Sequence, residues 1–534
     1  MLSNNQSVPT VKAGFSLVSK HPIASMVPGV FGCCIGEMSS VSEDIIPFRR
    51  LYYFNRSGPE RITLTTVRDS FMNHTTKPPE KQKAKKPSIA ADSFTLINPN
   101  AAGIDIGSDT HWVAVPEGRY DQTVRSFGCF TAELHALADW LQQCNISTVA
   151  MESTGVYWIP VFQILETRGF EVKLVNSRHV KQVPGRKSDI SDCQWIQRLH
   201  TYGLLNGSFR PEDQVCVLRS YWRHRDNLIR YASAHVQHMQ KALIQMNIHL
   251  HKVLSDITGV TGLRIIRAIL DGERDPLILA QMKDRRVQRS SHDIAQSLQG
   301  DYRAEHLFTL KQALELYDFY HRQIRDCDLH IQQCLEQFDT KDPINKQSQP
   351  PAQTTCKKPK GNQPHIDLRS HLYRITGVDF TQIDGLDVST VHTIISEVGL
   401  NPNAFHNAKC FVSWLGLCPD NRITGGKIKS SKTRKVVNRA ADAFRLAAQT
   451  QARSSSALGG FYRRIRSRLG APKAITATAH KLARIFYHLW KTGQSYVDKG
   501  AEYYEKMYQD RVLHNIKRKA QQLGYKITLE PIAA

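Results

Sequence analysis

Four carboxylates are the residues of this sequence whose types and spacing could do chemistry. Asp105 lies in a Gly-Ile-Asp-Ile-Gly motif, and Glu152 lies in Met-Glu-Ser-Thr-Gly. Asp189 and Asp192 are three residues apart in Lys-Ser-Asp-Ile-Ser-Asp. Clustered carboxylates bind hard divalent ions, and four of them can hold two ions about 3.5 to 4 Å apart for phosphoryl transfer. The acids therefore predict a site for Mg²⁺, or Mn²⁺, that acts on a phosphodiester.

The elements around these acids could bring them to one edge of a sheet. The pattern predicts strands at 103–115, 124–130, 147–151 and 170–175, and helices at 131–144 and 156–168. This order favours a mixed sheet covered by helices, whose strand ends are the usual place for a site. Asp189 and Asp192 should open a helix capped by Ser188, with both acids on one face. Each acid alone is more often structural, and acids at a helix start also favour the helix dipole.

A rival interpretation exists for the first motif. The segment Asp105-Ile-Gly-Ser-Asp109 also resembles the first phosphate loop of actin-like sugar kinases. Those kinases need a second glycine-rich loop in a matching half of the chain, and this sequence contains no such loop. The metal site is therefore the preferred interpretation.

The charge of the chain indicates a polyanionic partner. Its 534 residues include 71 Lys and Arg against 48 Asp and Glu, a net charge of +23. Such an excess attracts nucleic acid through counterion release. No apolar run reaches the roughly 18 residues of a membrane-spanning helix, so we expect no membrane partner. The 11 cysteines form no Cys-x-x-Cys pair, which favours free thiols and a cytoplasmic, nucleoid-associated protein.

A second group of residues, near the C-terminus, has the character of a phosphate-binding loop. Thr424 precedes Gly425, Gly426 and Lys427, and a helix is expected from near Val436. From residue 427 to 491 there are 16 Lys and Arg and a single acid. We therefore expect nucleic acid to bind here and beside the paired aspartates. The candidate binding residues are Arg186, Lys187, Gly425, Gly426, Lys427, Lys432, Arg434 and Arg439.

The length predicts several domains. The first hundred residues have no sustained period, and Met72 is an alternative start to Met1. Residues 210–338 contain two long helical runs, 221–253 and 307–338, which suit either a coiled-coil hairpin or an ordinary bundle. Residues 383–391 suit either a helix-hairpin-helix or a plain helix-turn-helix. We expect an extension or disordered segment at 1–100, the acidic site domain at 101–209, helices at 210–338, a polar linker at 339–365, a compact domain at 366–500 and a tail at 501–534.

The motifs together resemble those of a known family. The three acidic motifs, Trp-Leu-Gly-Leu-Cys-Pro at 414–419 and the Gly-Gly-Lys that ends at Lys427 are similar to motifs of DEDD transposases of the insertion-sequence-110 kind, relatives of the Piv-type DNA invertases. The resemblance runs from about residue 101 to 500. It implies a RuvC-like N-terminal domain of the ribonuclease H fold, a helical coiled coil and a small, mainly helical C-terminal transposase domain. It also implies a Mg²⁺-assisted recombinase that acts on donor and target DNA, is guided by a structured RNA, and works as a homodimer or homotetramer.

Carried over to this sequence, the resemblance assigns roles. Asp105, Glu152, Asp189 and Asp192 match the family's metal-binding tetrad. The family's nucleophile is a serine directly before the first glycine of the C-terminal motif, where this chain has Thr424. The alternative nucleophiles are Ser430 and Ser431. Two other functions stay open, a RuvC-like metal nuclease that cleaves with water and a nucleic-acid-binding remnant without catalysis.

Overall fold

The computed structural model describes residues 95–176, 180, 188–341, 350–351 and 361–525. Several expectations lie outside these residues. They concern nearly all of the N-terminal extension with the alternative start, the cations Arg186 and Lys187, most of the linker and the end of the tail.

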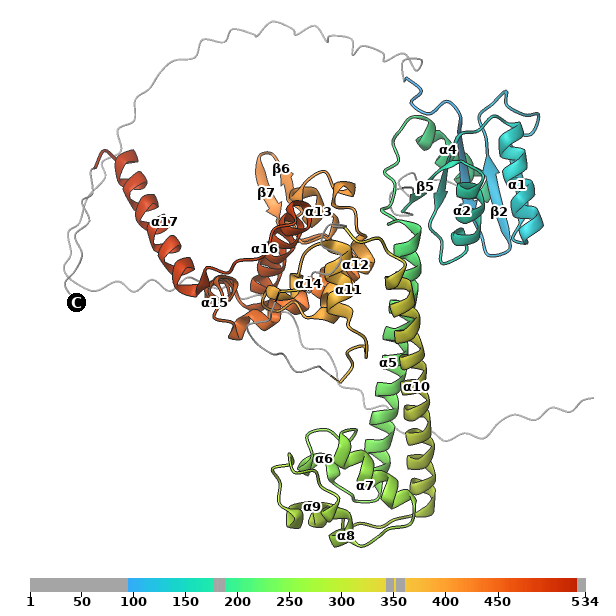
Figure 1. Cartoon of the computed structure of the whole chain (residues 1–534). Coiled ribbons are helices and arrows are strands. Elements are labelled where there is room, and N and C mark those ends of the chain that lie inside the picture. The colour runs from blue at the N-terminus through green and yellow to red at the C-terminus, as the bar shows by residue number, and fades with distance from the viewer. Residues whose placement is uncertain (1–94, 177–179, 181–187, 342–349, 352–360, 526–534) are drawn as a thin grey trace, which may run out of the picture. The chain divides into compact units, whose positions relative to one another are not determined.

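A five-stranded mixed sheet forms the N-terminal part of the described chain (Figure 1). Its strands are β1 (Ala101–Ile106), β2 (Thr110–Ala114), β3 (Val124–Gly128), β4 (Thr148–Glu152) and β5 (Glu171–Val175). Their spatial order is β3-β2-β1-β4-β5. Strand β2 pairs antiparallel with both β1 and β3, whereas β4 pairs parallel with both β1 and β5. The predicted mixed sheet is confirmed, and it is consistent with a RuvC-like α/β core.

The expected single strand over residues 103–115 was wrong. The chain reverses after Ile106 and returns as β2, so the sheet has one more antiparallel strand than predicted. Gly107 makes this turn: its N–H donates to the carbonyl of Thr110 at 3.1 Å. A β-carbon on Gly107 would stand 2.4 Å from that carbonyl oxygen. The absence of a side chain at Gly107 therefore allows the tight reversal of the chain.

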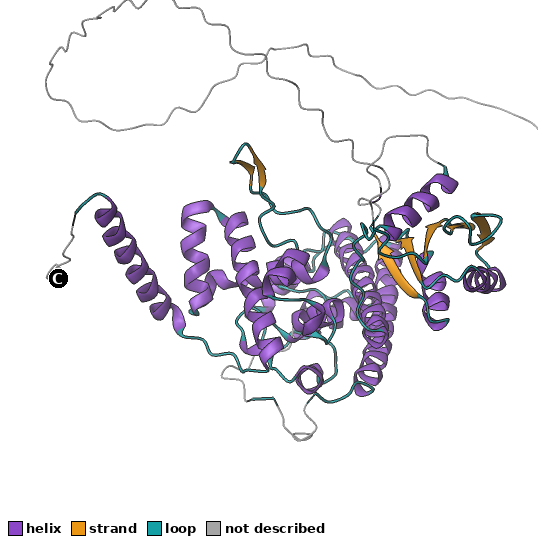
Figure 2. Ribbon diagram, turned by 90° about the horizontal axis from the view of Figure 1, so that it is seen from above, coloured by secondary structure: helices purple, strands orange, loops and turns teal. Residues whose placement is uncertain are grey.

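Helices lie on both faces of the sheet (Figure 2). Alternate residues of a strand point to opposite faces, and Ile104 and Met151 share one buried cluster with α1 (Thr131–Gln143) and α2 (Trp158–Thr167). On the other face α4 (Asp189–Thr201) packs against β1, β2 and β4. Asp105 and Glu152 directly follow Ile104 and Met151 in their strands, so their side chains point to the face that α4 covers.

Two long helices follow, α5 (Asp213–Gln245) and α10 (Ala304–Glu336), and they lie side by side (Figure 1). They run antiparallel, because early α5 residues pair with late α10 residues, as Tyr221 does with His330. The first helix ends earlier than predicted, since Asn247 takes a positive φ of 57°. The helices α6 (Leu250–Val253), α7 (Val260–Leu270), α8 (Pro276–Gln281) and α9 (Ser291–Ser297) join the pair and share a separate apolar core.

The C-terminal part is helical apart from one hairpin (Figure 1). Its elements are α11 (Leu368–Thr376), α12 (Val388–Val398), α13 (Ala408–Trp414), β6 (Arg422–Thr424), β7 (Lys427–Ser430), α14 (Arg439–Thr450), α15 (Ala457–Leu469), α16 (Ala471–Thr492) and α17 (Gly500–Gln522). Phe411, Phe444, Phe486 and Trp490 are fully buried in its core. Across the described ranges, no helix combines the length and the apolarity needed to cross a membrane.

The helix expected from near Val436 begins at Arg439, because Asn438 accepts the N–H of Ala441 and caps it. In the segment 383–391, which suited a helix-hairpin-helix or a helix-turn-helix, Gly385 lies between a 3-10 turn (Phe380–Gln382) and the start of α12 at Val388. Gly385 has a φ of 88°, and a β-carbon on it would stand 2.6 Å from the carbonyl oxygen of Ala447. This glycine therefore serves packing within the domain.

Candidate functional site

Asp105 and Glu152 lie beside each other at one end of the sheet. The parallel strands β1 and β4 pair Ile104 with Met151. The next residue in each strand is an acid, Asp105 in β1 and Glu152 in β4. Residues at equal register on neighbouring strands point to the same face. Both carboxylates are only partly exposed, whereas Ile104 and Met151 are fully buried on the opposite face. The sheet alone therefore places two of the four predicted acids together.

Helix α4 carries the other two acids to this face. Ser188 caps the helix by accepting the N–H of Ser191, and the Ser191 hydroxyl in turn accepts the N–H of Ser188. This capping box fixes the helix start, so that Asp189 and Asp192 occupy its first turn. The predicted N-cap is confirmed.

Gly103 determines how closely α4 approaches the sheet. A β-carbon on Gly103 would stand 2.3 Å from the backbone nitrogen of Gln197 and 2.5 Å from the carbonyl oxygen of Cys193. Gly103 and Asp105 are two residues apart and share a face of β1. The first turn of α4 therefore comes close to Asp105. In the sequence Gly103 stood out only as part of the Gly-Ile-Asp-Ile-Gly motif. The signal for close helix packing was a small residue two positions before a strand acid.

The four acids form one electrostatic unit. Partial burial and, after it, the carboxylates of Asp192, Glu152 and Asp189 in that order together raise the pKa of the Asp105 carboxyl to about 6. The backbone N–H of Ile106 acts in the opposite direction. Like charges raise a carboxyl pKa only when they are near. The structure thus brings together all four predicted acids, and Asp105 is at the centre of their mutual repulsion.

The chemistry of this group fits a divalent cation, although the side chains are not arranged as ligands. Four carboxylates supply the oxygen donors that Mg²⁺ or Mn²⁺ prefers. Among the described residues, however, no three Asp, Glu, His or Cys side chains converge closely enough to hold an ion as they stand. The neighbouring thiol of Cys193 is no substitute, because burial raises its pKa to about 12 and keeps it neutral. The residues that would hold a cation are therefore the carboxylates alone.

Thr424 lies on a different element, the exposed hairpin of β6 and β7. Gly425 and Gly426 form its turn with φ values of 56° and 74°, which only glycine adopts without strain. Thr424 and Lys427 are Cα partners across the turn, and both are exposed. Ser430 is half-buried with its hydroxyl accepting from the N–H of Lys432, whereas Ser431 is exposed. Of the three candidate nucleophiles, Thr424 is the one at the tip.

The candidate cations of this region divide into two groups. Lys427 and Lys432 have exposed side chains. Arg434 instead donates to the carbonyl of Ser413 at the base of the hairpin. Arg439 is 3.2 Å from a carboxylate oxygen of Asp226 on α5. The two lysines are therefore available to a nucleic acid, while the two arginines hold the hairpin and α14 in place.

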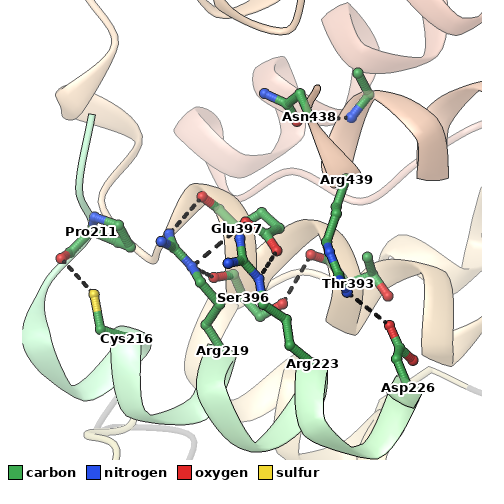
Figure 3. A network of polar contacts seen from close by, with 11 residues as sticks. Pro211, Cys216, Arg219, Arg223, Asp226, Thr393, Ser396, Glu397, Asn438 and Arg439 are labelled. Carbon is green, nitrogen blue, oxygen red and sulfur yellow. Dashed lines mark hydrogen bonds and ion pairs between the residues drawn. The ribbon is translucent and has the colours of Figure 1, made fainter. Parts of the chain in front are cut away.

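A polar network joins α5 to the C-terminal helices (Figure 3). Arg223 makes a bidentate contact with the Glu397 carboxylate at 2.7 and 2.9 Å. Arg219 donates to the backbone carbonyls of Ser396 and Glu397 at the end of α12. Sequence reasoning missed this junction, because its partners are more than 170 residues apart and carry no motif.

Comparison with known protein families matches both parts of the chain. A family model for DEDD transposases of the IS110 type, described as "Transposase", matches residues 102–248, which include the sheet and the four acids. A second, described as "Transposase IS116/IS110/IS902 family", matches residues 379–463, which include the hairpin. A search of curated proteins found no match. The two matches occur in the order that the sequence resemblance required, and the chain belongs to the IS110-type transposases.

Proposed function

We propose that this transposase recombines DNA through two centres, the carboxylate group of the RuvC-like core and the hydroxyl of Thr424. The single observation that carries the proposal is the raised pKa of the Asp105 carboxyl, which partial burial and three neighbouring, mutually repelling carboxylates cause. Such mutual repulsion stabilises nothing in the folded protein by itself, and perturbed carboxyl groups of this kind gather at functional sites. A divalent cation held by Asp105, Glu152, Asp189 and Asp192 would stabilise negative charge on the leaving oxygen.

The second centre forms a covalent bond to DNA. The Thr424 oxygen bonds to phosphorus as its hydroxyl proton is lost, and the bridging deoxyribose oxygen leaves with the bonding electrons and takes up a proton. The phosphodiester energy is kept in the threonine ester, so that the reverse attack by a new deoxyribose hydroxyl rejoins the strand. Exposed Lys427, directly across the turn, is placed to contact the same phosphate.

The partners follow from charge and family. A net charge of +23 supports binding of both donor and target DNA. Family membership supports a structured guide RNA and a homodimer or homotetramer in which the two centres meet across subunits. We place this activity at the nucleoid, in the cytoplasm.

The test is detection of a covalent protein–DNA adduct by denaturing gel electrophoresis, with Mg²⁺, guide RNA and both DNA sites. Thr424→Ala should abolish the adduct, whereas Ser430→Ala and Ser431→Ala should retain it. Asp105→Ala should abolish strand exchange while RNA binding persists. Cleavage without an adduct would favour a water-using nuclease, and absence of both cleavage and exchange would favour a nucleic-acid-binding remnant.

A further inference from the structure

The β6–β7 hairpin has two chemically different faces. Ile423 and Ile428 are directly opposite Cα partners, so their side chains project from the same face. Thr424 and Lys427, one residue further toward the turn, project from the other face. The hairpin is therefore an apolar surface on one side and a hydroxyl with a cation on the other.

The apolar face of this hairpin has no cover. Ile423 is 60% exposed and Ile428 is 61% exposed. Single exposed apolar residues are ordinary, but two β-branched side chains paired in register at the end of a protruding ribbon form a defined apolar wedge. The turn itself is unobstructed: a β-carbon on Gly425 or Gly426 would meet no atom within 4 Å. No neighbouring atoms therefore hinder insertion of the hairpin tip into a binding partner.

The charges around the wedge identify the occupant. Exposed cations surround it on the hairpin and on the loop that follows, and Asp420, just before the hairpin, is the one acid in residues 420–438. The cations are Arg422, Lys427, Lys429, Lys432 and Lys435. A second apolar protein surface would not call for this excess of positive charge, whereas a DNA duplex offers both phosphates and an apolar base stack. Proteins that kink DNA insert isoleucine and similar side chains between base pairs in this way.

We propose that Ile423 and Ile428 insert at a base step of duplex DNA and unstack it next to the phosphate on which Thr424 acts. The inference rests on the proposed function for the identity of that phosphate. Unstacking costs a few kcal/mol per step and is offset by burial of the two isoleucines and by phosphate contacts of the surrounding lysines. The kink bends the flanking backbone around the ribbon, toward the face that carries Thr424 and Lys427. Pyrimidine–purine steps such as TA are the easiest to open, so they should be preferred.

The experiment uses the full chain and a short DNA duplex that carries the fluorescent adenine analogue 2-aminopurine at a TA step. The wild-type protein should raise the fluorescence on binding, because an unstacked analogue is no longer quenched. The double substitution Ile423→Ser with Ile428→Ser should lose that increase. It should weaken binding by about tenfold or less, since charge supplies most of the affinity. Both side chains are mostly exposed, so the variant should fold, which circular dichroism checks.

A matched control is Leu446→Ser on α14, which removes an aliphatic side chain that is 62% exposed. This variant should raise the fluorescence as the wild type does. Wild-type binding without a fluorescence increase, or an increase retained in the double variant, would overturn the wedge. So would an increase with the matching RNA duplex but not with DNA. A change in the oligomeric state of the free double variant would instead identify the apolar face as a contact between copies.

Failure of the wedge and failure of the proposed function give different results. Thr424→Ala should lose the covalent adduct yet keep the fluorescence increase, because unstacking precedes bond formation. A double-serine variant that forms the adduct at the wild-type rate would refute the wedge and leave the nucleophile intact. If Thr424→Ala still raises the fluorescence and still forms the adduct, the wedge is retained and Thr424 is refuted as the nucleophile.

Discussion

Gly103 on β1 lies so close to Gln197 on α4 that a β-carbon on the glycine would stand 2.3 Å from the backbone nitrogen of Gln197. The helix that carries two of the four acids thus approaches the strand that carries a third only because this position has no side chain. The spacing of the acids depends on this packing contact, and the catalytic proposal depends on the spacing.

Gly103→Ala should therefore impair both stability and cation binding. Displacing α4 should lower the free energy of unfolding by about 1 to 3 kcal/mol, the usual cost of overpacking. It should also weaken Mn²⁺ binding, measured by isothermal titration. The control is Gly207→Ala, where a β-carbon would make an ordinary contact of 3.5 Å with Lys173. Equal behaviour of the two variants would show that the α4 contact does not position the acids.

Asp105→Asn should stabilise the protein at neutral pH. Because the folded pKa of Asp105 is raised from 3.8 to about 6, the folded state binds its proton more tightly than the unfolded state does. This group therefore lowers stability as pH rises from about 3.8 to 6. After allowance for its partial exposure, the substitution should gain about 1 to 2 kcal/mol at pH 8 and nothing near pH 3. Chemical denaturation at both pH values checks this, and a gain that is independent of pH would contradict it.

The same reasoning predicts the effect of Mg²⁺. A cation that neutralises the carboxylates should stabilise the wild type at pH 8 in proportion to RT ln(1 + [Mg²⁺]/Kd). Asp105→Asn should reduce that gain, since one ligand is neutral. The two effects together separate a cation site from a group of acids that merely repel.

Much of this site was predictable from the sequence, for a physical reason. The alternation of apolar residues around Asp105 and Glu152 reports local strand geometry, and Ser188 reports a helix start, so each acid could be assigned to an element. Convergence of the acids needed one further fact, which is the parallel pairing of β1 with β4. The turn at Gly107 was missed because the apolar residues of β1 and β2 were interpreted as one strand, although Gly107, Ser108 and Asp109 between them are residue types common in turns.

Contacts between distant segments could not be predicted. Arg439 was predicted only as a nucleic-acid-binding cation, and its partner Asp226 lies 213 residues earlier on another helix. Nothing in the local period of either segment indicates the pairing. The same holds for Arg225 and Asp328, whose burial reflects how α5 meets α10 rather than the residues next to them.

Arg225→Met should be among the most destabilising substitutions in the chain. Arg225 and Asp328 are 2% and 3% exposed and form an ion pair at 2.5 Å between α5 and α10. Removing the arginine leaves a buried carboxylate without its cation, at a cost of about 3 to 5 kcal/mol. The control is Arg267→Met, which breaks the largely exposed pair with Asp318 and should cost about 1 kcal/mol or less. A double variant with Asp328→Leu should recover part of the loss, and an additive double variant would contradict the coupling.

His392 should make the protein acid-sensitive. It is fully buried against Trp222, with ring centroids 4.1 Å apart, and burial lowers its pKa to about 3. Its contribution to stability is complete above about pH 6.5 and is lost as pH falls toward 3, because the unfolded chain binds the proton more tightly. Between pH 8 and pH 5 this costs about 2 kcal/mol. His392→Leu should remove that loss of stability. The separate loss that arises from His200, whose pKa is lowered to about 4, should remain. Urea unfolding at the two pH values measures the difference.

Thr424→Ser tests whether this chain's departure from the family serine limits its chemistry. The extra methyl of threonine restricts rotation about the bond that carries the hydroxyl and crowds an in-line approach to phosphorus. Because Thr424 is exposed at the hairpin tip, its replacement by serine should leave the fold unchanged. Removing the methyl should raise the rate of adduct formation, by about tenfold if it relieves about 1.4 kcal/mol of crowding. Single-turnover kinetics of adduct formation measure this rate, with Ser430→Thr as the control that adds the same methyl at a neighbouring hydroxyl. An increase for Thr424→Ser with no change for Ser430→Thr would place the reacting oxygen at residue 424, and a decrease for Ser430→Thr alone would move it to residue 430.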